Sequence, residues 1–303
     1  MLTYDQYVVA KSLNHVFDIL DANPASRIIA GATDLLPWAR YGRAGDVHLS
    51  SVIDVSRVAD LTYIKSDSKK IYLGANTTIA DFQNNPQLRT HAPVLAQCAV
   101  WFADDQIREQ ATVAGNIVNA SPAGDSQPAL LSLNTAIKLI RREQGKIIER
   151  TVPLQEFILG PGKTLLEPKE LVLGFECDSA LGFGSAYEKV GHRRSLVIST
   201  VCLAVVAKVN PAKNIVEDIR IGIGAVGPVP KRLHKLEKRL IAEPITSQLI
   251  HEIAEAGSED VQSRSRQEYR REVLVNFIER AIISALNEAG LPLVRFGEER
   301  LCA

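Results

Sequence analysis

The residues best suited to chemistry in this 303-residue chain lie between positions 111 and 125. Small residues, amides and hydroxyls stand there, where an ordinary core segment would carry leucine, valine or isoleucine. Glycine and alanine let a ligand approach the backbone, so that N–H groups reach phosphate oxygens. Asn116, Asn119, Ser121 and Asp125 add side-chain donors and acceptors. The pattern indicates either a site for a polar or anionic ligand or a turned loop that binds nothing.

A turn and a helix are predicted at the end of this stretch. Residues 122–125 have the composition of a turn, and residues 128–133 that of a helix. Asp125 or Ser126 is placed to cap this helix by accepting hydrogen bonds from its first amides. A helix N-terminus beside a polar turn favours an anionic ligand.

Two segments of the sequence resemble the FAD-binding loops of one protein family. Residues 112–125, continuing to Leu131, resemble the flavin-binding segment of the FAD subunit of molybdenum hydroxylases. That family includes the medium subunits of bacterial xanthine dehydrogenase and carbon monoxide dehydrogenase. Residues 27–36 resemble its first FAD loop, in which a strand runs into a glycine-rich turn and a helix. The two loops have the family's order and spacing, and the similarity extends over nearly the whole chain.

The resemblance implies that FAD is the cofactor and that its diphosphate lies against both loops. Backbone amides would neutralise the diphosphate, and Thr33, Thr112 and Asn116 would form hydrogen bonds with it. The complete set of implied FAD contacts is Ile28, Ile29, Ala30, Gly31, Ala32, Thr33, Asp34, Thr77, Ala111, Thr112, Ala114, Gly115, Asn116, Ser121, Ala123, Gly124, Asp125, Leu171 and Lys189.

The resemblance also implies which residues lie near the two ends of FAD. Asp125 would lie near the flavin or ribityl end, and Lys189 would contact the isoalloxazine ring. Leu171 would contact adenine through its backbone, and Thr77 belongs to a further matching stretch. The resemblance implies no catalytic acid or base, because the cofactor carries the redox chemistry.

The sequence departs from the family at two glycine positions. Ala32 replaces the second glycine of the first loop, and Ala114 replaces the first of the paired glycines in the second loop. An added methyl matters only where the glycine has positive φ or touches the phosphate. Asp104, Asp105 and Glu109 also replace residues that are usually less acidic, and negative charge near a diphosphate would weaken its binding.

Composition excludes several other classes of function. The 35 lysines and arginines balance the 35 aspartates and glutamates, so no net positive charge recruits nucleic acid. The four cysteines are scattered without a C-x-x-C pair, which predicts buried free thiols in a reducing cytoplasm. The histidines lack ligand spacing, so we expect no metal. The first residues do not form a signal peptide, and no apolar run is long enough to span a membrane.

The arrangement of predicted elements favours an α+β fold. Helices and strands mingle up to about residue 178, whereas three long β-rich segments followed by three helical patterns occupy the remainder. The spacing of Val16, Phe17 and Leu20 predicts a helix within a βαβ-like opening unit, and Gln144 and Gly145 predict a hairpin turn. The resemblance implies a two-part FAD-binding domain of the vanillyl-alcohol oxidase (PCMH) type over residues 1–178, with subdomains at about 1–60 and 61–178. A smaller α+β domain of the carbon monoxide dehydrogenase flavoprotein type would occupy residues 179–303.

A dinucleotide fingerprint, G-x-G-x-x-G, spans residues 222–227. Pro228 and Pro230 follow at once, where the helix of a Rossmann fold would already be running. We therefore expect a strand end and a turn there, without a bound dinucleotide.

Three functions follow as hypotheses. The first is an electron-transfer flavoprotein subunit, which takes electrons from the 2Fe–2S clusters of a partner, beside a subunit with a molybdenum cofactor, and passes them to NAD or another acceptor. The second is a free-standing FAD-dependent oxidoreductase. The third is a scaffold protein that has lost FAD, which Ala32 and Ala114 motivate.

Overall fold

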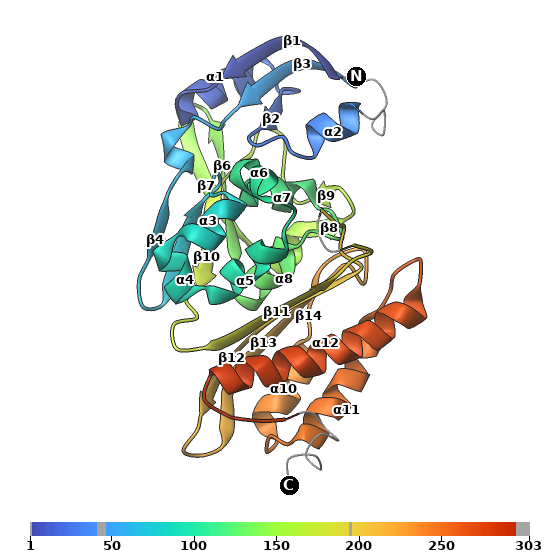
Figure 1. Cartoon of the computed structure of the whole chain (residues 1–303). Helices are drawn as coiled ribbons and strands as arrows, with labels where there is room; N and C mark the ends of the chain where they lie inside the picture. The colour runs from blue at the N-terminus through green and yellow to red at the C-terminus, as the bar shows by residue number, and fades with distance from the viewer. Residues whose placement is uncertain (1, 41–46, 194–195, 295–303) are drawn as a thin grey trace.

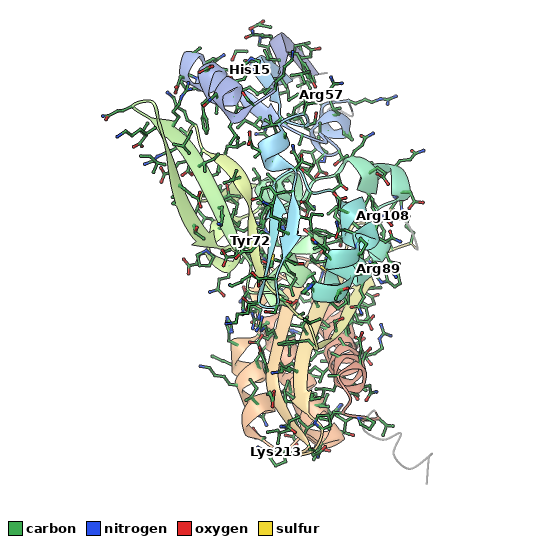
Figure 2. The ribbon with its side chains drawn as sticks, turned by 90° about the vertical axis from the view of Figure 1, so that its left-hand side faces the viewer. His15, Arg57, Tyr72, Arg89, Arg108 and Lys213 are labelled. Carbon is green, nitrogen blue, oxygen red and sulfur yellow. The ribbon has the colours of Figure 1, made fainter. Side chains whose placement is uncertain are left out.

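The chain folds into three successive units of sheet and helix, which are stacked along one axis (Figure 1). The computed structural model describes residues 2–40, 47–193 and 196–294. Figure 2 shows the length of the molecule, with His15 of the first unit and Lys213 of the third at opposite ends.

The first unit is a parallel sheet with two helices, in the strand order β1-β3-β2. Its elements are β1 (Leu2–Val9), α1 (Leu13–Ala22), β2 (Arg27–Ile29), α2 (Leu35–Arg40) and β3 (Val47–Asp54). Ser12 caps α1 by accepting a hydrogen bond from the His15 amide at 3.2 Å. Val16, Phe17 and Leu20 are buried at the predicted helical spacing. The prediction of a βαβ-like opening is confirmed, although the sequence analysis missed β1.

The second unit is built on an antiparallel sheet in the order β4-β5-β10-β6-β7. Helices lie beside this sheet, with Arg89 and Arg108 on the helical side and Tyr72 on a strand (Figure 2). The elements are η1 (Ala59–Leu61), β4 (Ile64–Ser66), β5 (Lys70–Gly74), α3 (Ile79–Asn84), α4 (Pro86–His91), α5 (Pro93–Trp101), α6 (Asp105–Gln110), α7 (Val113–Asn119), α8 (Ser126–Ser132), β6 (Ala136–Glu143), β7 (Lys146–Pro153), α9 (Leu154–Phe157), β8 (Ile158–Gly160), β9 (Lys163–Thr164) and β10 (Leu171–Asp178).

Two local expectations for residues 111–126 are wrong. Residues 113–119 form the helix α7 rather than a loop, because Thr112 accepts a hydrogen bond from the Gly115 amide at 3.1 Å and caps it. Burial of Val113 and Ile117 outweighs the weak helix propensity of its neighbours. The helix α8 is present, but the side chain of Asp125 does not cap it.

The third unit is an antiparallel sheet in the order β11-β12-β13-β14, followed by helices. Its elements are β11 (Gly184–Val190), β12 (Val201–Asn210), β13 (Ile215–Gly224), β14 (Lys231–Arg232), α10 (His234–Ala242), α11 (Ser247–Gly257), η2 (Ser258–Asp260) and α12 (Gln267–Glu288). Residues 222–227 complete β13 and enter a turn, as expected.

Both faces of the third sheet are covered. The helices α10 and α12 pack on one face, while α5 and α8 of the second unit lie against the other (Figure 1). Consecutive residues of β12 therefore belong to different cores: Cys202 and Ala204 pack with the second unit, and Leu203 and Val205 pack with the third-unit helices. This double burial explains the continuous apolar run of the strand.

Gly222 sets the spacing between the second and third units. A Cβ atom at this position would lie 2.3 Å from the carbonyl oxygen of Pro128 in α8. The absence of a side chain lets β13 approach the backbone of α8 closely. Within the described ranges, no helix is long and apolar enough to cross a membrane.

We predict that Gly222→Ala lowers the free energy of unfolding by about 1–3 kcal/mol, because the methyl group overpacks the contact with Pro128. Urea denaturation measures the change. Gly160→Ala is the matched control, since a Cβ atom there meets no atom within 4 Å. Equal stability of the two variants would contradict this account of the interface.

Candidate functional site

A cavity of about 350 Å³ lies between the first and second units. Its size is that of small-molecule sites in proteins. The lining comes from the loop between β2 and α2, from the start of α7, and from residues 166–172, which lead into β10. The two segments that resemble FAD loops thus face one cavity, although about 80 residues separate them in the sequence.

The first loop presents unused backbone donors to this cavity. The N–H groups of Gly31, Ala32, Thr33 and Asp34 donate no hydrogen bond within the described part of the chain. None of these residues is buried, so their amides are accessible to water or to a ligand. Consecutive free amides form a concave donor site that suits an anion such as a diphosphate.

The second loop differs, because most of its amides that line the cavity are already bonded. Val113 donates to the carbonyl of Thr77 at 2.8 Å, Ala114 to that of Ala75 at 3.3 Å, and Asn116 to that of Thr112 at 3.0 Å. The side chain of Asn116 supplies the free donor instead. Its Oδ1 accepts a hydrogen bond from Ser126 at 2.7 Å, while its Nδ2 donates none within the described chain. We expected backbone amides from both loops; the first loop presents a row of free amides, whereas among the described cavity-lining residues of the second loop only the amide of Thr112 is free.

The close packing of the two loops requires glycine at position 31, apart from any contact with a ligand. A Cβ atom there would lie 1.9 Å from the carbonyl oxygen of Gln110, so glycine allows the two loops to touch. Gly115 and Gly124 are less constrained by the backbone, because a Cβ atom at each would meet the side chains of Thr112 and Gln127.

The two alanines that replace family glycines lie in different backbone conformations. Ala32 has φ of 52°, which is left-handed backbone that disfavours a side chain. Ala114 lies within α7 and is absent from the residues with positive φ. The departure at Ala32 therefore introduces strain, and the departure at Ala114 does not.

The acidic departures lie outside the cavity lining. Asp104 accepts a hydrogen bond from the Ile107 amide at 2.8 Å, and Asp105 pairs with Arg108. Glu109 lines a second hollow, which shares Ala30, Gly31, Asn76 and Thr112 with the cavity. Asp34 does line the cavity, where partial burial raises the pKa of its carboxyl and Asn119 donates to it at 2.9 Å.

Asp125 and Lys189 form a buried ion pair at the junction of the second and third units. The distance from Lys189 Nζ to Asp125 Oδ2 is 2.6 Å, and Ser199 donates to Oδ1 at 2.5 Å. Burial raises the pKa of Asp125, and the charge of Lys189 opposes that shift. Neither residue is part of the cavity lining.

Some of the remaining predicted residues line the cavity, and others lie outside its lining. Leu171 lines the cavity with the first-loop residues, Ala111, Thr112, Ala114, Gly115 and Asn116. Thr77, Ser121, Ala123 and Gly124 lie outside the lining. The cavity lining also includes Asn76, Phe102 and residues 166–170, which the sequence pattern did not single out.

Within the described residues, no group of three His, Cys, Asp or Glu side chains is arranged to hold a metal ion. Cys98, Cys177 and Cys202 are buried and free, and burial raises the pKa of each thiol. Cys302 lies outside the described residues.

Comparison with known families agrees with the geometry. The model for the FAD binding domain in molybdopterin dehydrogenase matches residues 3–177. The chain belongs to this family. The carbon monoxide dehydrogenase flavoprotein C-terminal domain matches residues 185–285. The α+β class and the expected types of both parts are thereby confirmed.

Relatives and solved structures support the assignment. The chain is 29% identical to the glyceraldehyde dehydrogenase medium chain of Sulfolobus acidocaldarius, over 88% of this chain and 93% of that one. It is 27% identical to the xanthine dehydrogenase FAD-binding subunit of Escherichia coli O157:H7, over 96% and 99%. A chain of carbon monoxide dehydrogenase from Hydrogenophaga pseudoflava superposes with a TM-score of 0.84 at 25% identity, covering 93% and 97%.

Membership of this family establishes the cofactor class and the type of protein. The chain is an FAD-binding medium subunit of the molybdenum hydroxylase family, and its relatives are oxidoreductases. The expectations of FAD and of an FAD-dependent oxidoreductase subunit are confirmed. The free amides of the first loop and the neutral amide of Asn116 fit the diphosphate of this cofactor.

We predict opposite responses to glycine at the two alanine positions. Ala32→Gly releases about 1–2 kcal/mol of left-handed strain, which offsets the entropy cost of glycine, so stability stays equal or rises. Ala114→Gly loses about 0.5–1 kcal/mol, because α7 loses a helix former. Urea denaturation of both variants tests the difference. A loss of stability in Ala32→Gly as large as that in Ala114→Gly would show that position 32 is unstrained.

Proposed function

We propose that this chain is the electron-transfer subunit of a molybdenum hydroxylase complex similar to xanthine dehydrogenase. The observation that carries the proposal is the row of free amides from Gly31 to Asp34, which faces a cavity shared with the second loop. The oxygens of a diphosphate satisfy these donors, and Arg27 and Lys169 line the same cavity. Bound FAD would supply two-electron and one-electron redox chemistry, while the protein positions it.

The residues of the cavity have separate roles in this proposal. The first-loop amides and Thr33 bind the diphosphate, and Asn116 Nδ2 adds a donor from the opposite wall. Leu171 and residues 166–170 surround the adenosine end. Asp125 and Lys189 lie at the flavin end, where their buried charges set the electrostatic environment.

The partners are also a proposal. A subunit with a molybdenum cofactor would hydroxylate the substrate, and a subunit with 2Fe–2S clusters would deliver single electrons to this chain. NAD or another acceptor would then take the electrons, in the cytoplasm. The names of the relatives as medium chains and FAD-binding subunits support this arrangement. We also propose the domain division at residues 178 and 179, which lies between the two matched regions.

The alternatives make different use of the same fold. A free-standing FAD-dependent oxidoreductase would act on its own small substrate without partners. A scaffold that has lost FAD would be consistent with the strained backbone at Ala32. The presence of flavin and the need for partners distinguish the three functions.

We expect the purified chain to show flavin absorption bands near 450 nm, or to acquire them when FAD is added. Acid release followed by chromatography should recover FAD rather than FMN, because the cavity extends to the proposed adenosine end. A folded chain that stays colourless with excess FAD would support the scaffold alternative instead.

We expect the chain alone, loaded with FAD, to hydroxylate neither xanthine nor an aldehyde above background. The described residues hold no candidate metal site, and the hydroxylation chemistry belongs to another subunit. Turnover assays with the complete complex provide the positive control. Sustained hydroxylation by the isolated chain would favour the free-standing oxidoreductase.

A further inference from the structure

No residue of the third unit lines the cavity, yet the third unit holds the end of the second loop. Lys189 donates a hydrogen bond to one carboxylate oxygen of Asp125 at 2.6 Å, and Ser199 donates to the other at 2.5 Å. The hydroxyl of Tyr187 donates to the main-chain carbonyl of Asp125 at 2.9 Å. All three side chains are buried, so these bonds are shielded from competition by water.

The next residue bonds to the second loop instead of the third unit. Ser126 is fully buried, and its hydroxyl donates to Asn116 Oδ1 at 2.7 Å. This bond directs the acceptor end of the Asn116 amide away from the ligand and leaves Nδ2 as a donor. Two adjacent residues thus connect the third unit to the one free side-chain amide of the second loop.

We propose that the third unit positions the Asn116 amide for the cofactor through Asp125 and Ser126, with Ser126, Tyr187 and Ser199 as positioning residues. The inference rests on the proposed function, because it concerns the same cofactor site. If the amide turned over, its Oδ1 would face a diphosphate oxygen, and both groups are acceptors. Binding of FAD and the docking of the third unit are therefore coupled in free energy.

The first test compares two buried serines of the same helix. Ser126→Ala should raise the dissociation constant of FAD about 10-fold, because it frees the Asn116 amide to turn. Ser132→Ala is the matched control: Ser132 is equally buried in α8, but its hydroxyl donates to the carbonyl of Ala129 at 2.8 Å. Flavin fluorescence titration of the whole chain measures affinity, and Ser126→Thr, which keeps the hydroxyl, should restore it.

The second test asks whether the third unit acts through Asn116. Ser199→Ala should weaken FAD binding about 3- to 10-fold, by loosening Asp125. The same substitution should have no further effect in an Asn116→Ala background, since a double-mutant cycle isolates the shared pathway. Ser185→Ala is the control for a buried hydroxyl of β11, because Ser185 contacts Glu288 and not Asp125.

The outcomes separate this inference from the proposed function. If the parent chain binds FAD and both Ser126→Ala and Ser199→Ala bind it equally well, the positioning role is overturned while the cofactor assignment stands. Equal losses in Ser199→Ala with and without Asn116→Ala would also overturn it, because the effect would then bypass the amide. Thermal melts without FAD report whether a variant is folded, and a variant that melts far below the parent is replaced by its cysteine counterpart, which fills the same space with a weaker donor.

Discussion

The buried carboxylate of Asp125 joins the second loop to the third unit, and the placement of both depends on it. Removing a charge from water is costly unless it is paired and hydrogen-bonded, and this carboxylate has Lys189 and Ser199 on its two oxygens. The pairing requires β11 and the loop before β12 to stay against the end of the second loop. The ion pair thus constrains the position of the third sheet, whatever it contributes to net stability.

The two loops solve the problem of holding an anion in different ways. The first loop leaves its amides free, and Gly31 lets this loop pack closely against Gln110. The second loop uses most of its amides in α7 and on the carbonyls of Ala75 and Thr77, so the side chain of Asn116 supplies a donor instead. The donors of both loops are neutral, and the cations that line the same cavity, Arg27 and Lys169, come from β2 and from the segment before β10.

Local pattern predicted much of this fold, and contacts between distant residues account for what it missed. The spacing of Val16, Phe17 and Leu20 identified α1, and the turn at Gln144 and Gly145 identified the hairpin of β6 and β7. The helix α7 was missed because its stability comes from a cap and from burial, which composition does not record. The partners of Asp125 were equally hidden, since Lys189 lies 64 residues away along the chain.

The double burial of β12 has a consequence for how such a chain diverges. Neighbouring residues of this strand pack against different parts of the molecule. Ala204 packs against the cofactor-binding half, and Leu203 packs against the helices behind the sheet. A substitution in the core of either half therefore limits which side chains fit at the β12 positions that face that half. Because alternate residues of β12 belong to the two cores, substitutions in one core must leave the strand compatible with the other. Sequence change in the two parts is therefore linked through this strand.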